Sequence, residues 1–513
     1  MNQKNLDVNK LYQNIMKQAN MSPKNVNPKS ASAGAKKEDK KPKILLKFPL
    51  KYSLTGANGQ ETAQGEATVQ LAEGSLTILP KFGEVIFLTL RDIADLSEVD
   101  YKVRLVLTSN ETLTLSNLGY QYEDFLRVFA GLHNEMLLKD MLMQEGVRKS
   151  NIAADVVYLD ESGKEKIKGK CSLRLYNTAI VVIPEKADLV RIPYSDISEI
   201  KDEDFRLAIT TDFNEKITFS MLGQEFDPTV RLLSKVINEL SLAVQSSLKE
   251  LVPEENPAII RQAARLMKEG KAARMSDIEA ISPALWTGLE KKVASTDIKE
   301  EYNYLVSMAQ REKLCIGIKR GLMGGLTGDY IWFLIPIYNL NPDAPGNAMA
   351  MEALSQGNSS KATYFFRLVS RNAYRNFKNI DELHHIADDF IARMNRCMLA
   401  INFRREPIYL SDEKLADPKY QHYKYAMQKI PSLKTLRDLF IGRVIHASDE
   451  QWQQDVKDLL QFNITAADDA ARWSKAGEDA DLLEEDISNS PEKDAGDNTP
   501  EGNTENTSDT KEA

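Results

Sequence analysis

Residues 75–93 read SLTILPKFGEVIFLTLRDI, and residues 179–197, which lie 104 positions later, read AIVVIPEKADLVRIPYSDI. The same shift aligns the chain with itself, without a gap, from about residue 59 to residue 136. Matching groups include Ile78-Leu79-Pro80 with Val182-Ile183-Pro184, Asp92-Ile93 with Asp196-Ile197, Asp100-Tyr101 with Asp204-Phe205, and Asn110-Glu111 with Asn214-Glu215. A shared register of this length indicates that a whole domain is duplicated, not a short solenoid unit.

Each copy is predicted to consist of about seven short strands. In the first copy, β-type runs cover residues 66–71, 75–79 and 85–90. Apolar residues then alternate with polar ones at Val103, Leu105, Leu107, Leu113 and Leu115, which is typical of half-buried strands. Asn58-Gly59 and residues 160–163 are hairpin turn signals. Asn110 and Asn214 lie between paired strands, where asparagine tolerates the left-handed conformation of a tight turn.

The period of the apolar pattern changes after the last strand of each copy. Phe125, Val128, Phe129, Leu132 and Met136 recur at helical spacing and predict an amphipathic helix over residues 122–144. Val230, Leu233, Ile237 and Leu240 repeat this pattern in the second copy. Each repeated unit is therefore expected to end in a helix.

About seven strands followed by one helix resembles the pleckstrin-homology-like (PH-like) fold, in which the last helix plugs one open end of a bent sheet. The duplicated part of the chain is similar to tandem bacterial-type PH-like domain proteins. The resemblance covers about 200 residues and depends on strand count, spacing and helix position. It implies binding of phosphoinositides, peptides or other proteins, and only rarely catalysis.

One row of lysines is a candidate contact with anionic lipid. Lys164, Lys166, Lys168 and Lys170 follow each other at i, i+2 spacing near the first hairpin of the second copy, so they share one strand face. The resemblance implies phosphoinositide binding at such a position, and the first copy has no base there. The alternative is an ordinary solvated strand face.

Composition limits the remaining possibilities. The 513 residues suffice for three or so domains, with 42% hydrophobic and 27% charged residues. The net charge of −9 is concentrated at the acidic end, while the first forty or so residues are rich in lysine. The folded middle is therefore nearly balanced, which argues against extensive contact with nucleic acid.

Cysteine usage and hydropathy suggest a cytoplasmic protein. Cys171, Cys315 and Cys397 are far apart and form no CxxC pair, which suits a reducing compartment and excludes a disulfide framework or a cysteine-based zinc site. The N-terminus lacks the apolar core of a signal peptide. The longest apolar run, residues 331–338, is eight residues long and contains Pro336, so no transmembrane segment is expected.

We expect an α+β multidomain chain. The predicted divisions are a disordered basic segment (1–42), two PH-like domains (43–146 and 147–250), a helical connector (251–312), an α+β C-terminal domain (313–463) and a disordered acidic tail (464–513). In the C-terminal domain, which resembles no named family, antiparallel strands are predicted at residues 313–319, 330–339, 347–354 and 362–369, and helices at 380–400, 418–428, 433–444 and 449–462.

The C-terminal domain contains two candidate phosphate or nucleotide sites. Gly324 and Gly325 belong to a glycine-rich segment beside Lys319 and Arg320, where backbone amides can bind phosphate, although no P-loop pattern is present. Arg367, Arg371 and Arg375 are interleaved with aromatic residues, a pattern that can bind nucleotides. The alternatives are a flexible strand turn and an amphipathic helix with one basic face.

A metal site is a third candidate. His384, His385, Asp388 and Asp389 lie on one predicted helix, and each His shares a face with the Asp four positions later. Adjacent histidines point about 100° apart, so only one pair can serve a site. A surface His–Asp pair is the alternative reading.

The sequence assigns no catalytic residue and no cofactor. It favours a non-catalytic cytoplasmic scaffold that binds a protein partner through its tandem PH-like domains. Two alternatives stay open. One is a nucleotide- or metal-binding enzyme with its site in the C-terminal domain, and the other is peripheral membrane binding through residues 164–170.

Overall fold

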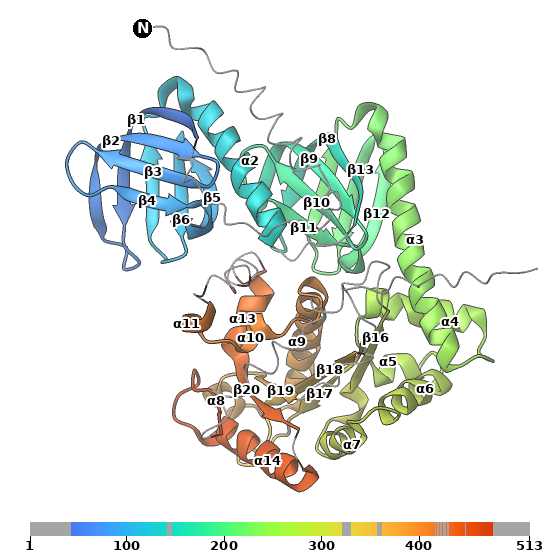
Figure 1. Cartoon of the computed structure of the whole chain (residues 1–513). Coiled ribbons are helices and arrows are strands. Elements are labelled where there is room, and N and C mark those ends of the chain that lie inside the picture. The colour runs from blue at the N-terminus through green and yellow to red at the C-terminus, as the bar shows by residue number, and fades with distance from the viewer. Residues whose placement is uncertain are drawn as a thin grey trace, which may run out of the picture.

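The computed structural model describes residues 43–140, 146–320, 330–355, 362–415, 417, 420, 423, 427, 430–446 and 448–475. Three predicted features lie outside these residues: the segment 1–42, the tail from residue 476 onward, and the pair Gly324 and Gly325. The fold is α+β, with three antiparallel sheets of seven, seven and six strands (Figure 1).

The first seven strands form one curved sheet with the order β4-β3-β2-β1-β7-β6-β5. Its strands are β1 (Ile44–Thr55), β2 (Glu61–Ala72), β3 (Ser75–Pro80), β4 (Ile86–Thr89), β5 (Ile93–Val99), β6 (Lys102–Leu107) and β7 (Thr112–Ser116). Helix α2 (Tyr122–Asp140) follows and buries Phe125 and Phe129 completely in the core of this sheet. We call β1–β7 with α2 the first module.

The next seven strands repeat this topology in the order β11-β10-β9-β8-β14-β13-β12. They are β8 (Val147–Leu159), β9 (Glu165–Tyr176), β10 (Ala179–Pro184), β11 (Val190–Pro193), β12 (Ile197–Glu203), β13 (Arg206–Thr211) and β14 (Lys216–Ser220), and α3 (Phe226–Leu251) follows. Asn110 and Asn214 have φ of 66° and 61°, so the left-handed turns predicted for both are confirmed. We call β8–β14 with α3 the second module.

The third sheet has the order β15-β16-β17-β18-β19-β20. Its strands are β15 (Ala273–Arg274), β16 (Cys315–Lys319), β17 (Tyr330–Ile337), β18 (Ala348–Ser355), β19 (Ala362–Arg367) and β20 (Phe440–Ile445). The helices around it are α4 (Pro257–Leu266), α5 (Met275–Glu279), α6 (Pro283–Ala294), α7 (Lys299–Ser307), α8 (Arg371–Tyr374), α9 (Ile380–Ala400), α10 (Glu406–Tyr409), α11 (Asp412–Leu415), α13 (Pro431–Leu439) and α14 (Asp449–Thr465). We call residues 257–475 the C-terminal part.

Helices cover both faces of the third sheet. On one face, Trp332 and Phe366 pack with residues of α9 and α13. On the other face, Phe333 and Ile335 share a core with α4–α7, α14 and Leu248 near the end of α3. The segment predicted to be a connector is therefore part of the core of the C-terminal part, and β15 within it forms one edge of the sheet.

Two sequence predictions in this region differ from the structure. The helix predicted over residues 433–444 ends at Leu439, because Phe440–Ile445 pairs with β19 as strand β20. The first residues of the predicted tail are folded, since α14 continues to Thr465, Trp473 packs against the sheet core and the backbone N–H of Trp473 donates to Ile441 O (2.7 Å). The helix predicted over residues 418–428 lies mostly outside the described residues.

Within the part of the chain that the structure describes, no helix is both long enough and apolar enough to cross a membrane.

Candidate interaction surfaces

Helix α2 joins the two modules. Near its C-terminal end, Leu137 and Leu138 pack against the outer face of the second sheet, which is the face turned away from that sheet's own core (Figure 1). The second module contributes the apolar side chains Tyr176, Val181, Ile183 and Leu189, all at most 5% exposed. We call these four residues the covered face.

Polar contacts fix the position of α2 beside the covered face. The buried Asn134 side chain bonds twice to the loop before β11: its Nδ2 donates to Ala187 O (2.9 Å), and its Oδ1 accepts from Leu189 N (2.7 Å). His133 Nδ1 lies 2.7 Å from Asp188 Oδ1. Since most of these groups are buried, the contact is specific as well as apolar.

Among the described residues, no helix lies on the equivalent face of the first module. At the same register, Thr77, Leu79 and Val85 replace Val181, Ile183 and Leu189. Val85 is 58% exposed, and the neighbouring Phe82 and Phe87 are 91% and 62% exposed. We call Thr77, Leu79, Phe82, Val85 and Phe87 the open face. Neighbouring exposed apolar side chains of this size mark candidate interaction sites.

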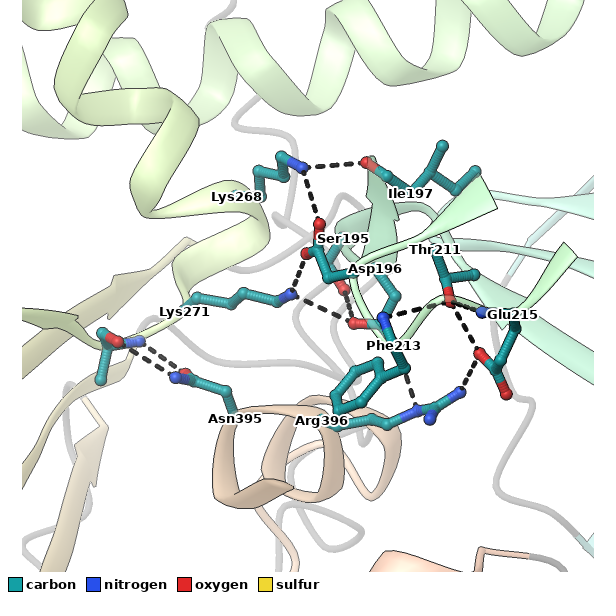
Figure 2. A network of polar contacts seen from close by, with 12 residues as sticks. Ser195, Asp196, Ile197, Thr211, Phe213, Glu215, Lys268, Lys271, Asn395 and Arg396 are labelled. Atoms are coloured by element: carbon teal, nitrogen blue, oxygen red, sulfur yellow. Dashed lines mark hydrogen bonds and ion pairs between the residues drawn. The ribbon is translucent and has the colours of Figure 1, made fainter. Parts of the chain in front are cut away.

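A polar network joins the second module to the C-terminal part (Figure 2). Arg396 on α9 is at its centre: its Nη2 donates to Glu215 Oε2 (2.8 Å), and its Nε lies 3.1 Å from Oδ2 of the fully buried Asp196. The guanidinium also lies 4.2 Å from the ring centre of Phe213. Burial lowers the pKa of Arg396, but the charges of Asp196 and Glu215 outweigh it and raise this pKa above its ordinary value.

Lys271 completes this network from the loop before β15. Its Nζ lies 3.2 Å from both Asp196 Oδ1 and Asp212 Oδ2. On the other side, Asn395 exchanges two hydrogen bonds with the backbone of Ala272, of 2.7 and 3.0 Å. Three distant stretches of sequence are thus connected through one buried carboxylate (Figure 2).

A cleft of about 720 Å³ lies beside the network, between the second module and α9. Its charged and aromatic lining includes Arg191, Phe213 and Glu215 on one side and Asp389, Arg393 and Arg396 on the other. No His or Cys lines it, and Glu215 is already bonded by Arg396 and by Tyr158 Oη (2.9 Å). Glu215 and Arg396 at the edge of the cleft are therefore engaged in the contact between the second module and α9.

The residues of the first predicted phosphate site are in contact with protein groups. Lys319 is only 2% exposed, and its Nζ donates to Asn402 Oδ1 (3.1 Å). Arg320 pairs with Glu250 on α3. The structure does not place the two glycines of this site, because both lie outside the described residues.

The three arginines of the second predicted site do not form one helical face. Arg367 lies on strand β19, whereas Arg371 lies on the short helix α8 and Arg375 directly after it. All three donate to the end of α14: Arg367 to the Asn463 side chain (2.7 Å), Arg371 to Asn463 O (2.7 Å) and Arg375 to Ile464 O (3.3 Å). Burial, and then the positive charge of Arg371, lowers the pKa of Arg367 to about 10. These arginines therefore hold the C-terminal end of α14 against the third sheet.

The predicted metal residues make separate contacts. His384 Nδ1 lies 2.6 Å from Tyr338 Oη, and Asp388 is paired with Lys313 (3.1 Å) and Arg274 (2.8 Å). His385 and Asp389 are exposed on the same helix. Across the residues that the structure describes, no group of three or more His, Cys, Asp or Glu could hold a metal ion. The predicted metal set is therefore not assembled.

The predicted lysine row is on the surface. Lys164, Lys166, Lys168 and Lys170 are exposed at the start of β9. Lys166 lies 3.4 Å from Asp160, and Lys168 lies 3.9 Å from Glu165. Nearby carboxylates therefore offset part of the positive charge of this row.

Sequence reasoning missed Arg396, Lys271 and Asn395. Their partners lie 59 or more residues away in the sequence, so no local spacing marks them. The open face could have been noticed from the sequence, because Phe82, Val85 and Phe87 stand close together beside a predicted strand.

The fold and these surfaces define an α+β protein in which α2 joins two repeated modules and Arg396 joins the second of them to the C-terminal part. No protein-family model matches the chain, and no curated protein matches it. A solved structure described as "Structure of the Spt16D Pob3N heterodimer" is similar over 33% of this chain and 85% of its own, with 15% sequence identity and a TM-score of 0.14. A likeness at this TM-score carries no argument about fold or function.

Proposed function

We propose that this chain is a non-catalytic, cytoplasmic interaction scaffold that binds a protein partner through two tandem PH-like domains, residues 43–146 and 147–250. Two features support the PH-like assignment: the shared order of seven antiparallel strands, and the helix that follows each sheet. The cytoplasmic location is supported by the three free, buried cysteines.

The observation that carries this proposal is the difference between the open and covered faces. The covered face is occupied by α2, while Phe82, Val85 and Phe87 at the equivalent place stay exposed. Binding scaffolds present such apolar groups on a rigid support. Here the support is a seven-stranded sheet whose strand β3 has a buried inner side.

The test compares the wild-type chain with a Val85→Glu/Phe87→Glu variant, both used as affinity baits in lysate of the source organism, with native mass spectrometry of both purified proteins. The proposal predicts that wild type recovers a stoichiometric protein partner, that the variant loses it, and that neither protein carries a nucleotide or metal. Equal recovery by both proteins, or a nucleotide mapped to residues 313–463, would contradict the proposal and favour the enzyme alternative.

A second candidate function is attraction to anionic membranes, because the four lysines of residues 164–170 are exposed together. Substituting all four by Glu should abolish pelleting with phosphatidylserine vesicles, and pelleting by wild type should fall as salt increases. Vesicle binding that is insensitive to these substitutions would exclude this row as the contact.

A further inference from the structure

The outer faces of the two sheets have the same strand order, but a helix covers only the second one in the described residues. Strands β3 and β10 take the same place in two sheets of identical strand order. All six residues of β10 are buried, whereas in β3 only Leu76 and Ile78, which point to the inner core, are buried. The second module therefore shows what binds to this face of the sheet, namely one amphipathic helix that lies across it.

The covered face shows how such a helix is held. An apolar pair, Leu137 and Leu138, meets the sheet, and a side-chain amide, that of Asn134, bonds to the backbone of the following loop. A basic ring, His133, faces the carboxylate of Asp188. The contact thus has three separable parts: an apolar pair, a side-chain amide and a ring nitrogen that faces a carboxylate.

The open face offers counterparts to all three. In the aligned loop of the first module, Gly83 O and Val85 N stand at the sequence positions of Ala187 O and Leu189 N, with Gly83 at φ 110°, and the residue in the place of Asp188 is Glu84, also a carboxylate and exposed. Phe82 replaces Lys186, and Phe87 replaces Arg191. The open face is therefore more apolar at its edge than the covered one.

We infer that the open face binds one amphipathic helix of a partner protein, laid against β3 and the loop before β4 as the C-terminal end of α2 lies against β10 and the loop before β11. The partner helix presents apolar residues at i, i+3 or i+4, and i+7, and a Lys, Arg or His that faces Glu84. This inference depends on the proposed function and names the class of partner.

The experiment is a selection of random 16-residue peptides displayed on phage against the immobilised full-length protein, followed by fluorescence anisotropy with the enriched peptides. We expect enriched sequences with helical apolar spacing and at least one basic residue. Val85→Glu or Phe87→Glu should weaken their binding at least about tenfold, whereas Tyr120→Glu, at an exposed aromatic elsewhere in the first module, should change it less than about twofold. Glu84→Lys should weaken binding of the basic peptides, about threefold or more.

Other outcomes would overturn the inference. Enriched peptides without helical spacing, or peptides that bind wild type and Val85→Glu equally, would exclude a helix on this face. If deletion of residues 1–42 raised peptide affinity more than about tenfold, the occupant would be this chain's own segment. A dimer that Val85→Glu dissolves would identify a second copy as the occupant. In each case a partner lost by the Val85→Glu/Phe87→Glu bait would still support the scaffold proposal, so the two failures are distinguishable.

Discussion

Strands β10 and β3 take the same place in two copies of one module, yet β10 is buried on both sides and β3 on one. Duplication alone does not produce this difference. The second module follows a helix, α2, that both closes the first module and covers the second, and the described residues contain no equivalent helix over the first. The comparison teaches that, in a tandem pair, the last helix of the first module can cover the outer face of the second sheet. The outer face of the first sheet then stays exposed at Phe82, Val85 and Phe87.

The largest expected effect comes from placing a charge on each face. Val181→Asp puts a carboxylate under α2 in place of a buried apolar side chain, and its cross-strand neighbours Arg174 and Arg191 offset only part of the burial cost, so it should cost about 3–4 kcal/mol of unfolding free energy. Thr77→Asp, at the same register on the open face, should change stability by less than about 0.5 kcal/mol. Urea unfolding followed by far-UV circular dichroism measures both. Equal costs would show that the two faces are covered alike.

The second largest effect is expected at the polar network between the second module and the C-terminal part. Arg396→Met leaves Asp196 and Glu215 without their guanidinium, and Lys271 compensates only in part, so we expect a loss of about 3 kcal/mol. All four tryptophans, Trp286, Trp332, Trp452 and Trp473, are in the C-terminal part, so urea unfolding followed by tryptophan fluorescence reports on it.

Arg393→Met is the matched control for this experiment, since Arg393 is exposed on the same helix. It should change the unfolding free energy by less than about 0.5 kcal/mol. If both variants behave alike, the network in Figure 2 does not join the two parts in solution.

The smallest effect is a pH dependence confined to the C-terminal part. Burial lowers the pKa of His446, but the hydrogen bond to Glu352 and the charges of Glu352 and Glu301 outweigh it, so the pKa is raised above its ordinary value. The stabilisation is therefore complete below about pH 6.5 and is lost as pH rises through the folded-state pKa. His446→Gln should reduce stability at pH 5.5 and converge with wild type at alkaline pH. If the difference in unfolding free energy between wild type and His446→Gln were the same at pH 5.5 and pH 9, the raised pKa of His446 would be contradicted.

Several local features could be predicted from the sequence because short-range chemistry decides them. The turns at Asn110 and Asn214 need left-handed backbone, and asparagine tolerates it. Helix 380–400 is found at its predicted bounds because a side-chain cap at Asn379 and an uninterrupted apolar face define it locally.

Other features could not be predicted, because distant partners decide them. Phe440–Ile445 continues a helical pattern, and only pairing with β19 makes it a strand. In the sequence, Arg367, Arg371 and Arg375 have the pattern of a ligand site. In the structure, the end of α14 accepts their hydrogen bonds. Strand β10 did carry an overlooked signal, since its run AIVVIP lacks the alternation of SLTILP in β3 and indicates burial on both sides.

The most direct test of the central claim is cysteine labelling at the matched positions Val85 and Leu189, which are 58% and 5% exposed. The native cysteines give little background, because all three are buried and burial raises the pKa of the Cys171 thiol to about 12. A maleimide should label Val85→Cys rapidly, within a few fold of its rate with a small thiol peptide, and Leu189→Cys at least about a hundredfold more slowly. Equal rates at the two positions would contradict the account, because either the open face would be covered or α2 would not cover the second module.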